Sequence, residues 1–255
     1  MSNPYSVGFR AAMFVFFLFV GIAGFSTLAW QRYYGASSAT EEQQSSVNAA
    51  LAVASPTPTV APDNINRPTS EPYTGDLSIF EDPKREQNLQ INRVMDILKI
   101  KEGSTVADIG AGSGWFTVRA ARRVALKGMV YAVEINQDYL NYISDRARRE
   151  NLSNIKTVLG TEDDPTLPAD SIDAALILKT YHEIAQPIKL LKNLRKSLRA
   201  NARLGVIDRN GKGDDHGLDQ NKVVQEAEQA GFKLAENYDF VKPDGMDYFL
   251  VFEAK

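Results

Sequence analysis

The sequence contains no cysteine. This absence excludes disulfide bonds, thiolate-based zinc sites and cysteine nucleophiles. It does not indicate a redox compartment, because proteins on either side of a membrane can lack cysteine. Histidine is scarce as well, since His182 and His216 are the only two in the chain. Imidazole chemistry is therefore confined to two positions.

Neither sign of charge dominates. The formal net charge of −3 provides no general attraction for nucleic acid, so we expect no nucleic-acid partner. The rest of the composition is typical of globular proteins, with 44% hydrophobic and 24% charged residues among 255. A chain of this length has room for one or two domains with a sizeable core.

Charged side chains are missing from one long stretch, Ala11 to Trp30. It has about the length that a helix needs to cross the hydrocarbon core of a bilayer, and basic and aromatic residues follow it. We therefore expect residues 1–34 to form a single-pass transmembrane anchor that contacts membrane lipid through residues 11–30. The alternative is a cleavable signal peptide with Thr27 and Ala29 before the cut, although the apolar run is long for one.

Residues 35–76 are rich in Ala, Ser, Thr, Gln and Pro. Such a composition buries too little apolar surface to fold by itself, so we predict a disordered or partly extended linker. A proline-rich ligand for a partner domain is the alternative, but no PxxP core with basic flanks is present. We expect the folded domain to occupy residues 77–255.

After residue 77, short apolar runs alternate with amphipathic helical patterns. The expected strands are 105–109, 129–133, 155–159, 172–178 and 203–208, and the expected helices are 82–103 in part, 116–124, 137–150, 187–198 and 218–230. Residues 234–240 and 248–252 then flank a turn at Lys242-Pro243-Asp244-Gly245, which predicts a β-hairpin. We therefore predict an α/β fold: a Rossmann-like, seven-stranded, mostly parallel sheet with a C-terminal antiparallel hairpin and helices on both faces.

Three glycines at alternate positions, Gly110, Gly112 and Gly114, follow the first expected strand and precede a helix. Glycines there allow positive φ angles and let a ligand approach main-chain N–H groups at a helix N-terminus. Glu134 ends the second strand about twenty residues later, where a carboxylate is placed to accept hydrogen bonds from ribose hydroxyls. The pattern predicts a nucleoside ligand. The G-x-G-x-G spacing, with Trp115 where a third dinucleotide glycine would fall, argues against a dinucleotide.

With Asp108 before the glycines, these motifs resemble the class I S-adenosylmethionine-dependent methyltransferases. The resemblance covers roughly residues 81–255 and rests on V-A-D-I-G-A-G-S-G-W-F-T, V-Y-A-V-E-I-N, L-P-A-D-S-I-D-A-A-L-I-L and Y-H-E-I, in that order. The nearest likeness is to uncharacterised bacterial methyltransferases with an N-terminal membrane segment. The resemblance implies S-adenosyl-L-methionine as the cofactor and a small-molecule or lipid-like methyl acceptor.

The resemblance also implies a set of cofactor-binding residues. The methionine part would contact Asp108, Gly110, Ala111, Gly112 and Gly114, the ribose would contact Glu134 beside Ile135, and Lys179 would complete the site. The loop 161–164 would reach the adenine through Asp163 or Glu162, with a slight preference for Asp163. The family usually has Asp where this chain has Thr161, and its usual Pro-Gly-Gly turn is replaced by Ala200-Asn201-Ala202.

The expected catalytic residues follow the fourth and fifth strands. Methyl transfer is an in-line displacement, which requires alignment of donor and acceptor and, for some acceptors, removal of a proton. His182 has a suitable unperturbed pKa for a general base, and a packing or capping role fits its position equally well. Tyr181 is expected to form a wall of the pocket. Asp208 is expected to contact substrate or to cap the residues after it.

Two further clusters admit different interpretations. Metal-ligand side chains occur together at Asp214, Asp215 and His216, but they are consecutive in a glycine-rich loop, so we expect a solvated loop and no metal site. A basic stripe at helical spacing is formed by Lys189, Lys192, Lys196 and Arg199. Such a stripe is typical of the solvent face of an amphipathic helix, and in a membrane-tethered protein it would also suit anionic lipid.

Three functions remain open from the sequence. The first is a membrane-tethered methyltransferase, the second is a catalytically silent S-adenosylmethionine-binding module in a membrane assembly, and the third is an NAD-dependent oxidoreductase. An active methyltransferase requires its domain in the cytoplasm, where the cofactor is made, whereas an export signal would place it in the periplasm or outside the cell. The sequence indicates neither the methyl acceptor nor the oligomeric state.

Overall fold

The computed structural model describes residues 65–212 and 216–255. The expected membrane segment 11–30 and most of the expected linker therefore lie outside the described residues. Within the described ranges, no helix is both long and apolar enough to cross a bilayer.

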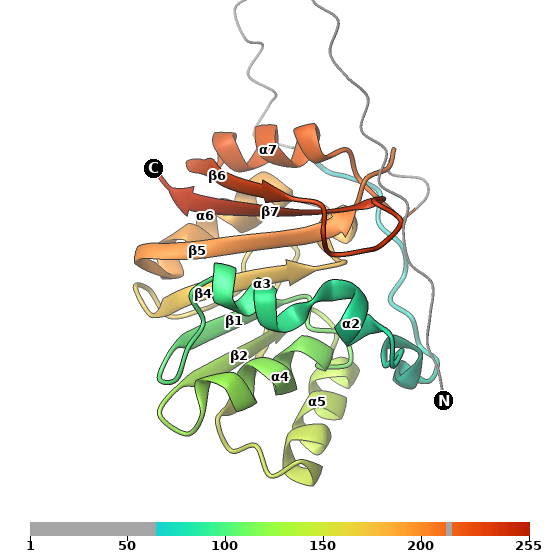
Figure 1. Cartoon of the computed structure of the whole chain (residues 1–255), viewed down its shortest axis with the longest axis vertical. Helices are drawn as coiled ribbons and strands as arrows, with labels where there is room; N and C mark the ends of the chain where they lie inside the picture. Colours follow the sequence, from blue (N-terminus) through green and yellow to red (C-terminus); the bar gives the residue numbers. More distant parts are fainter. Residues whose placement is uncertain (1–64, 213–215) are drawn as a thin grey trace, which may run out of the picture. The chain divides into compact units, whose positions relative to one another are not determined.

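A seven-stranded sheet forms the centre of the described domain, in the order β3-β2-β1-β4-β5-β7-β6 (Figure 1). Its strands are β1 (Thr105–Ile109), β2 (Met129–Glu134), β3 (Ile155–Leu159), β4 (Ile172–Leu178), β5 (Leu198–Arg209), β6 (Phe232–Tyr238) and β7 (Asp247–Ala254). Strands β1 to β5 are parallel, and β7 runs antiparallel to both β5 and β6. The predicted mostly parallel sheet with a C-terminal hairpin is confirmed.

Helices cover both faces of this sheet, as predicted. They are η1 (Leu77–Phe80), α2 (Arg85–Leu89), α3 (Ile91–Ile97), α4 (Trp115–Val124), α5 (Gln137–Arg149), η2 (Tyr181–Glu183), α6 (Pro187–Ser197) and α7 (Gln220–Gln229). One apolar cluster joins α3 and α4 to one face, and another joins α6 and α7 to the other. In Figure 1, α3 and α4 lie in front of the strands.

The alternation of side chains along the strands explains why both faces are covered. In β1, Val106 packs with the α3–α4 cluster, whereas Ala107 packs with the α6–α7 cluster. In β4, Leu176 and Ile177 divide in the same way. Because successive residues of a strand point to opposite faces, a strand covered on both sides is apolar throughout. The nearly continuous apolar run of β4 follows from this.

Two elements differ from their expected bounds. The first expected helix is divided into α2 and α3 at Gln90, which has a φ of 48°. Strand β5 begins at Leu198, earlier than expected, and continues through Asn201 with a φ of 66°. Asn tolerates this left-handed conformation better than most residues. Asn201 thereby supplies the local bend at the position where the resemblance led us to expect a Pro-Gly-Gly turn.

The packed part of the chain also begins before Leu77, where the sequence placed the start of the domain. Arg67 donates its backbone N–H to the carbonyl of Ala185 at 2.8 Å and a side-chain N–H to the carbonyl of Tyr181 at 3.0 Å. Ser70 donates its backbone N–H and its hydroxyl to the carboxylate of Glu183. The end of the predicted linker is therefore part of the domain.

The chain order of the sheet reverses between β1 and β4, which are neighbours. In open α/β sheets, ligands bind beyond the carboxyl ends of the strands at such a position. The glycine turn follows β1 and the segment beginning at Lys179 follows β4. The two segments are therefore at the carboxyl edge of the sheet, where a ligand is expected.

Candidate functional site

The glycine turn joins β1 to α4. Gly110, Gly112 and Gly114 have φ angles of 70°, 57° and 75°, which side chains with a Cβ adopt only at a cost. A Cβ on Gly110 would lie 2.3 Å from Thr180 Cγ2, whereas a Cβ on Gly112 would meet nothing within 4 Å. Gly110 thus allows close packing against the segment after β4. Gly112 faces open space at the N-terminus of α4, where a ligand can approach the main chain.

Glu134 lies beside this turn, at the end of β2. Its carboxylate accepts hydrogen bonds from the backbone N–H groups of Gly112 at 2.6 Å and Ile135 at 3.1 Å. The side chain is 8% exposed. Burial raises the pKa of Glu134, and the two backbone hydrogen bonds oppose that rise. The turn and the acid, which the sequence paired by spacing alone, are in direct contact.

Asp108 is completely buried one residue before the end of β1. The hydroxyl of Thr117, on α4, donates to Asp108 Oδ2 at 2.6 Å. Burial raises the pKa of Asp108 to about 7; the Thr117 hydrogen bond opposes this effect, and the charge of Glu134 adds to it. Asp108 is therefore a carboxyl group that a nearby cation would readily ionise.

A cavity of about 100 Å³ lies over the carboxyl ends of β1, β2 and β4. Its lining residues are Thr69, Ile109, Gly110, Val133, Glu134, Ile135, Thr161, Glu162, Thr180, Glu183, Ile184, Ala185 and Leu190. Glu162 is among them. Asp163, which the sequence slightly favoured for the adenine contact, is not; its carboxylate accepts a hydrogen bond from the Thr161 hydroxyl at 2.9 Å. The geometry thus places Glu162, not Asp163, at the cavity.

A second cavity, of about 350 Å³, lies between η1 and α2 on one side and the β6–β7 turn on the other. Lys179 lines this cavity and forms an ion pair with Asp247, which is 3% exposed. The sequence placed Lys179 in the cofactor site, but its side chain is absent from the lining of the first cavity. Its φ of 58° turns consecutive side chains to different sides, so Lys179 lines the second cavity and Thr180 the first.

Residues of the segment before α3 were not predicted from the sequence to take part in the cofactor site. The carboxylate of Glu81 accepts hydrogen bonds from the Ser113 hydroxyl, in the glycine turn, at 2.7 Å and from Arg146, on α5, at 3.0 Å. The guanidinium of Arg85 lies 4.7 Å from the centre of the Trp115 ring. These contacts hold the segment against the glycine turn. The sequence does show charged residues next to the expected helix start at residue 82. It does not indicate which residues they contact.

Tyr181 does not form a wall of either cavity. Its side chain is completely buried, and its hydroxyl donates to Glu226 Oε2, on α7, at 3.0 Å. Burial, together with the charge of Glu226, raises the pKa of Tyr181 well above its usual value. The side chain faces the core under α7, so its expected place at the pocket does not agree with the geometry.

His182 and Asp208 are paired at the ends of η2 and β5. The ring Nδ1 of His182 lies 3.0 and 2.9 Å from the two carboxylate oxygens of Asp208, and the backbone N–H of His182 donates to Oδ2 at 3.0 Å. Asp208 is completely buried. Burial lowers the pKa of His182, but the hydrogen bond and charge of Asp208, with the charge of Glu183, outweigh this and raise it. Asp208 therefore orients the ring and leaves Nε2 available.

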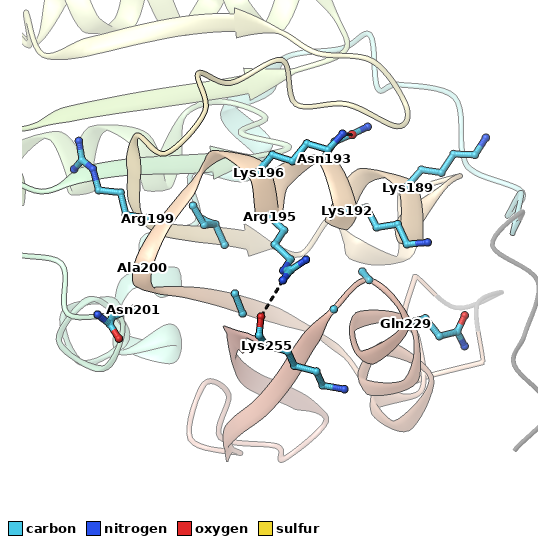
Figure 2. Close-up of a pocket in the computed structure, with 14 residues that line it drawn as sticks. Lys189, Lys192, Asn193, Arg195, Lys196, Arg199, Ala200, Asn201, Gln229 and Lys255 are labelled. Atoms are coloured by element: carbon cyan, nitrogen blue, oxygen red, sulfur yellow. Dashed lines mark hydrogen bonds between the residues drawn. The ribbon is translucent and has the colours of Figure 1, made fainter.

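A larger cavity, of about 920 Å³, lies away from these residues, along α6 and the ends of β5 and β7 (Figure 2). It contains the basic stripe predicted from the sequence, with Lys189, Lys192, Lys196 and Arg199 in its lining. Figure 2 shows Arg195 reaching the carbonyl of Lys255, to which it donates at 2.9 Å. We call this region the basic groove. Because it lies at the amino end of β5, it is separated from the carboxyl edge of the sheet.

Comparison with known proteins relates this arrangement to one kind of domain. Residues 106–201 match the family described as methyltransferase domain. Curated relatives include 2-phytyl-1,4-naphtoquinone methyltransferase of Trichormus variabilis, 29% identical over 42% of this chain and 48% of that protein, and protein-L-isoaspartate O-methyltransferase of Pyrococcus horikoshii, 27% identical over 37% of this chain and 42% of that protein. The match spans less than half the length of each of these relatives.

Solved structures show the same fold. A crystal structure of an S-adenosylmethionine-dependent methyltransferase from Aquifex aeolicus matches 69% of this chain and 95% of its own, with a TM-score of 0.64 and 24% identity. The structure of the [4+2]-cyclase SpnF matches 66% of this chain and 81% of its own, with a TM-score of 0.57 and 15% identity. The fold is that of the S-adenosylmethionine-dependent methyltransferases. Family and fold together imply S-adenosyl-L-methionine as the cofactor.

Proposed function

We propose that this chain, whose residues 106–201 match the methyltransferase domain family, transfers a methyl group from S-adenosyl-L-methionine to a small-molecule or lipid-like acceptor. A site, not a fold, determines activity, and the fold neighbour SpnF is named for a cyclisation. The proposal therefore depends on the geometry around the glycine turn.

The observation that carries the proposal is the contact between Glu134 and Gly112 at the edge of the first cavity. A carboxylate held in this way presents its remaining lone pairs to the hydroxyls of a ribose. Glu162 lines the same cavity, where an acceptor for the adenine amino group is needed. Asp108, one residue before the end of β1, is the acid proposed for the charged amino acid part of the cofactor. The positive charge of Arg85 acts on it and opposes the rise of its pKa.

The second cavity is the proposed acceptor site. It adjoins the first because Lys179 and Thr180, consecutive in the chain, line one cavity each. Its lining combines apolar Ile79 and Phe80 with charged residues of both signs, since Asp82 and Asp247 lie there with Arg85, Lys179 and Lys242, and Asp247 is paired with Lys179. Such a lining suits an apolar acceptor with a polar end. The relative named for 2-phytyl-1,4-naphtoquinone supports an acceptor of lipid-like character.

The proposed enzyme is tethered to a membrane through residues 11–30, with its domain in the cytoplasm, where the methyl donor is made. The apolar sequence of that segment supports the tether. Reporters fused after residue 255 test on which side of the membrane the domain lies. Activity of a reporter that works only in the cytoplasm supports the proposal, and activity of a reporter that works only after export contradicts it.

The function itself is tested by calorimetric titration of the full chain with S-adenosylmethionine and its demethylated product, followed by a methyl-release assay on membrane extract. Binding with turnover is expected. Glu134→Gln should weaken cofactor binding, since it exchanges an anionic acceptor for an amide, whereas Glu102→Gln, at a solvent-exposed ion pair with Lys127, should not. Binding without turnover would identify a silent module, and binding of NAD alone would identify an oxidoreductase.

A further inference from the structure

Three side chains with metal-ligand atoms meet beside the first cavity. His182 and Glu183 belong to η2, after β4, and His216 lies between β5 and α7. One ligand atom from each side chain lies within 4.8 Å of the other two. His182 Nε2 lies 3.6 Å from Glu183 Oε1, and His216 Nδ1 lies 3.7 Å from the same oxygen. The fold thus brings together side chains more than thirty positions apart in the sequence. Their ligand atoms lie close enough to one another to coordinate a single metal ion.

The spacing of these atoms fits tetrahedral coordination. Zinc binds imidazole nitrogen and carboxylate oxygen at about 2.1 Å, which places neighbouring ligands of a tetrahedron about 3.4 Å apart. The two measured separations, 3.6 and 3.7 Å, exceed this value by only a few tenths of an ångström. The side chain of His216 is 79% exposed, so its rotation can adjust the distance from its Nδ1 to Glu183. The separation between His182 and Glu183 is already close to the tetrahedral value.

Two of the three side chains are already oriented by neighbours. Asp208 accepts from His182 Nδ1 and so directs Nε2 toward Glu183. The hydroxyl and the backbone N–H of Ser70 donate to the two carboxylate oxygens of Glu183 at 2.9 and 2.7 Å. In metal sites, the histidine nitrogen that does not bind the metal usually donates a hydrogen bond to a carboxylate or another acceptor. A carboxylate in this position fixes the tautomer of the ring and increases its basicity.

From this geometry we propose that His182 Nε2, Glu183 and His216 Nδ1 bind a divalent cation of the zinc type. Two imidazoles and one carboxylate are borderline donors, which zinc prefers over the all-oxygen sets that bind calcium and magnesium. Three protein ligands leave the fourth position open, and the exposure of His216 provides a path from solvent. Asp208 is then a positioning residue that acts through His182.

The cation changes what His182 can do. A nitrogen that holds the ion cannot also accept a proton, so this site replaces the general base that the sequence suggested. Because Glu183 also lines the first cavity, the ion would lie beside the proposed cofactor site. There it would act as a Lewis acid on an oxygen of a ligand in that cavity, a role that rests on the proposed methyl transfer. Binding of the ion itself does not depend on that transfer.

The test is metal binding by the full chain, without cofactor or substrate. Zinc is titrated in competition with a chromophoric chelator, and cobalt(II) is added separately because its visible absorption reports tetrahedral coordination. We expect one zinc ion per chain and intense tetrahedral cobalt bands. His216→Ala should weaken zinc binding at least about 100-fold and abolish those bands, and Asp208→Asn should weaken binding about 10- to 100-fold.

Two further variants complete the test. Glu183→Gln keeps the size of the side chain but removes the anionic ligand, and it should weaken zinc binding as His216→Ala does. Glu228→Gln removes an exposed carboxylate on α7 and should bind zinc as the unmodified chain does. His216 is exposed, so its loss should leave the thermal unfolding of the metal-free protein unchanged. Equal zinc affinity in the unmodified chain, His216→Ala and Glu183→Gln would overturn the proposal, whether or not the protein transfers methyl groups.

Discussion

Nη2 of Arg67 lies 2.7 and 2.8 Å from the two carboxylate oxygens of Glu226, on α7, and both side chains are almost completely buried. Tyr181 joins the pair, since its hydroxyl donates to Glu226 and its carbonyl accepts from Arg67. Three segments far apart in the sequence meet at this point. The ion pair therefore fixes the start of the domain to the segment after β4, which carries His182.

Arg67→Met should destabilise the domain strongly. The substitution leaves Glu226 buried without its cation, which typically costs about 3 to 5 kcal/mol. The measurement is the free energy of unfolding in urea. Arg123→Met serves as the control, because its pair with Asp96 is partly exposed and its loss should cost less than about 1 kcal/mol. Equal losses in the two variants would contradict a structural role for the Arg67–Glu226 pair.

Gly112→Ala and Gly110→Ala should separate cofactor binding from folding. Ala at Gly112 meets no neighbour, so its left-handed φ should cost only about 1 to 2 kcal/mol of stability. Its methyl group would occupy the space beside the main chain where the cofactor approaches, and affinity for S-adenosylmethionine should fall at least about tenfold. The measurements are thermal unfolding and calorimetric titration.

Gly110→Ala should act mainly on folding instead. Its Cβ would collide with Thr180, whose hydroxyl is held by the carbonyls of Gly110 and Leu178. The neighbour is therefore restrained, and the domain should lose more stability than in Gly112→Ala. A Gly112→Ala protein that bound the cofactor normally would show that the open space at this glycine is not used.

The buried Asp108 predicts a pH-dependent stability. Below about pH 4 its carboxyl is protonated in both the folded and the unfolded chain. Between that pH and about 7, the pKa of the folded state, only the unfolded chain releases the proton, so the free energy of unfolding falls as pH rises. Asp108→Asn should remove this loss, which is on the order of 4 kcal/mol at pH 8.

The measurement for Asp108 is thermal unfolding of the two proteins without cofactor from pH 4 to pH 8. Their unfolding temperatures should be similar at pH 4 and separate as pH rises, with the variant the more stable. Asp145→Asn, at an exposed ion pair on α5, should follow the unmodified chain. Parallel pH curves for all three proteins would mean that Asp108 ionises normally in the folded state.

The basic groove should bind anionic lipid. Reversal of charge at Lys189, Lys192 and Lys196 should weaken binding of the fragment 58–255 to phosphatidylserine liposomes by more than about 100-fold, at about 1 kcal/mol for each lysine. Binding is measured by co-sedimentation of the fragment with the liposomes. The control variant reverses the charges of Lys84, Lys101 and Lys127, which are exposed outside the groove. It changes the net charge by the same amount as the groove variant. Unchanged liposome binding by the groove variant would contradict the prediction that the basic groove binds lipid.

The periodicity of the sequence was sufficient to predict the fold. Runs such as Ile172–Leu178 reveal a strand covered on both faces, and each lies between helical patterns, so the parallel sheet follows from local features. The glycine turn and Glu134 were predicted for a similar reason. Their spacing along one β-α-β unit fixes their spatial relation, and the structure places them in contact.

The remainder of the candidate site depends on contacts that spacing does not encode. Lys179 and Thr180 point to different cavities because of one left-handed residue. His216 was interpreted with Asp214 and Asp215, its neighbours in the chain; the latter two lie outside the described residues. Its approach to Glu183 is a contact between residues that lie far apart in the sequence. Long-range side-chain contacts of this kind require the three-dimensional structure.

The position of β7 has a consequence for synthesis of the protein on the ribosome. Because β7 lies between β5 and β6, β6 emerges first but has no strand to pair with until residues 247–254 have followed it. Until then β5 presents an unpaired edge to solvent, and such edges favour aggregation during folding. Completion of the sheet must therefore wait for the final residues of the domain, so a nascent chain stalled before residue 247 would be left with an open sheet.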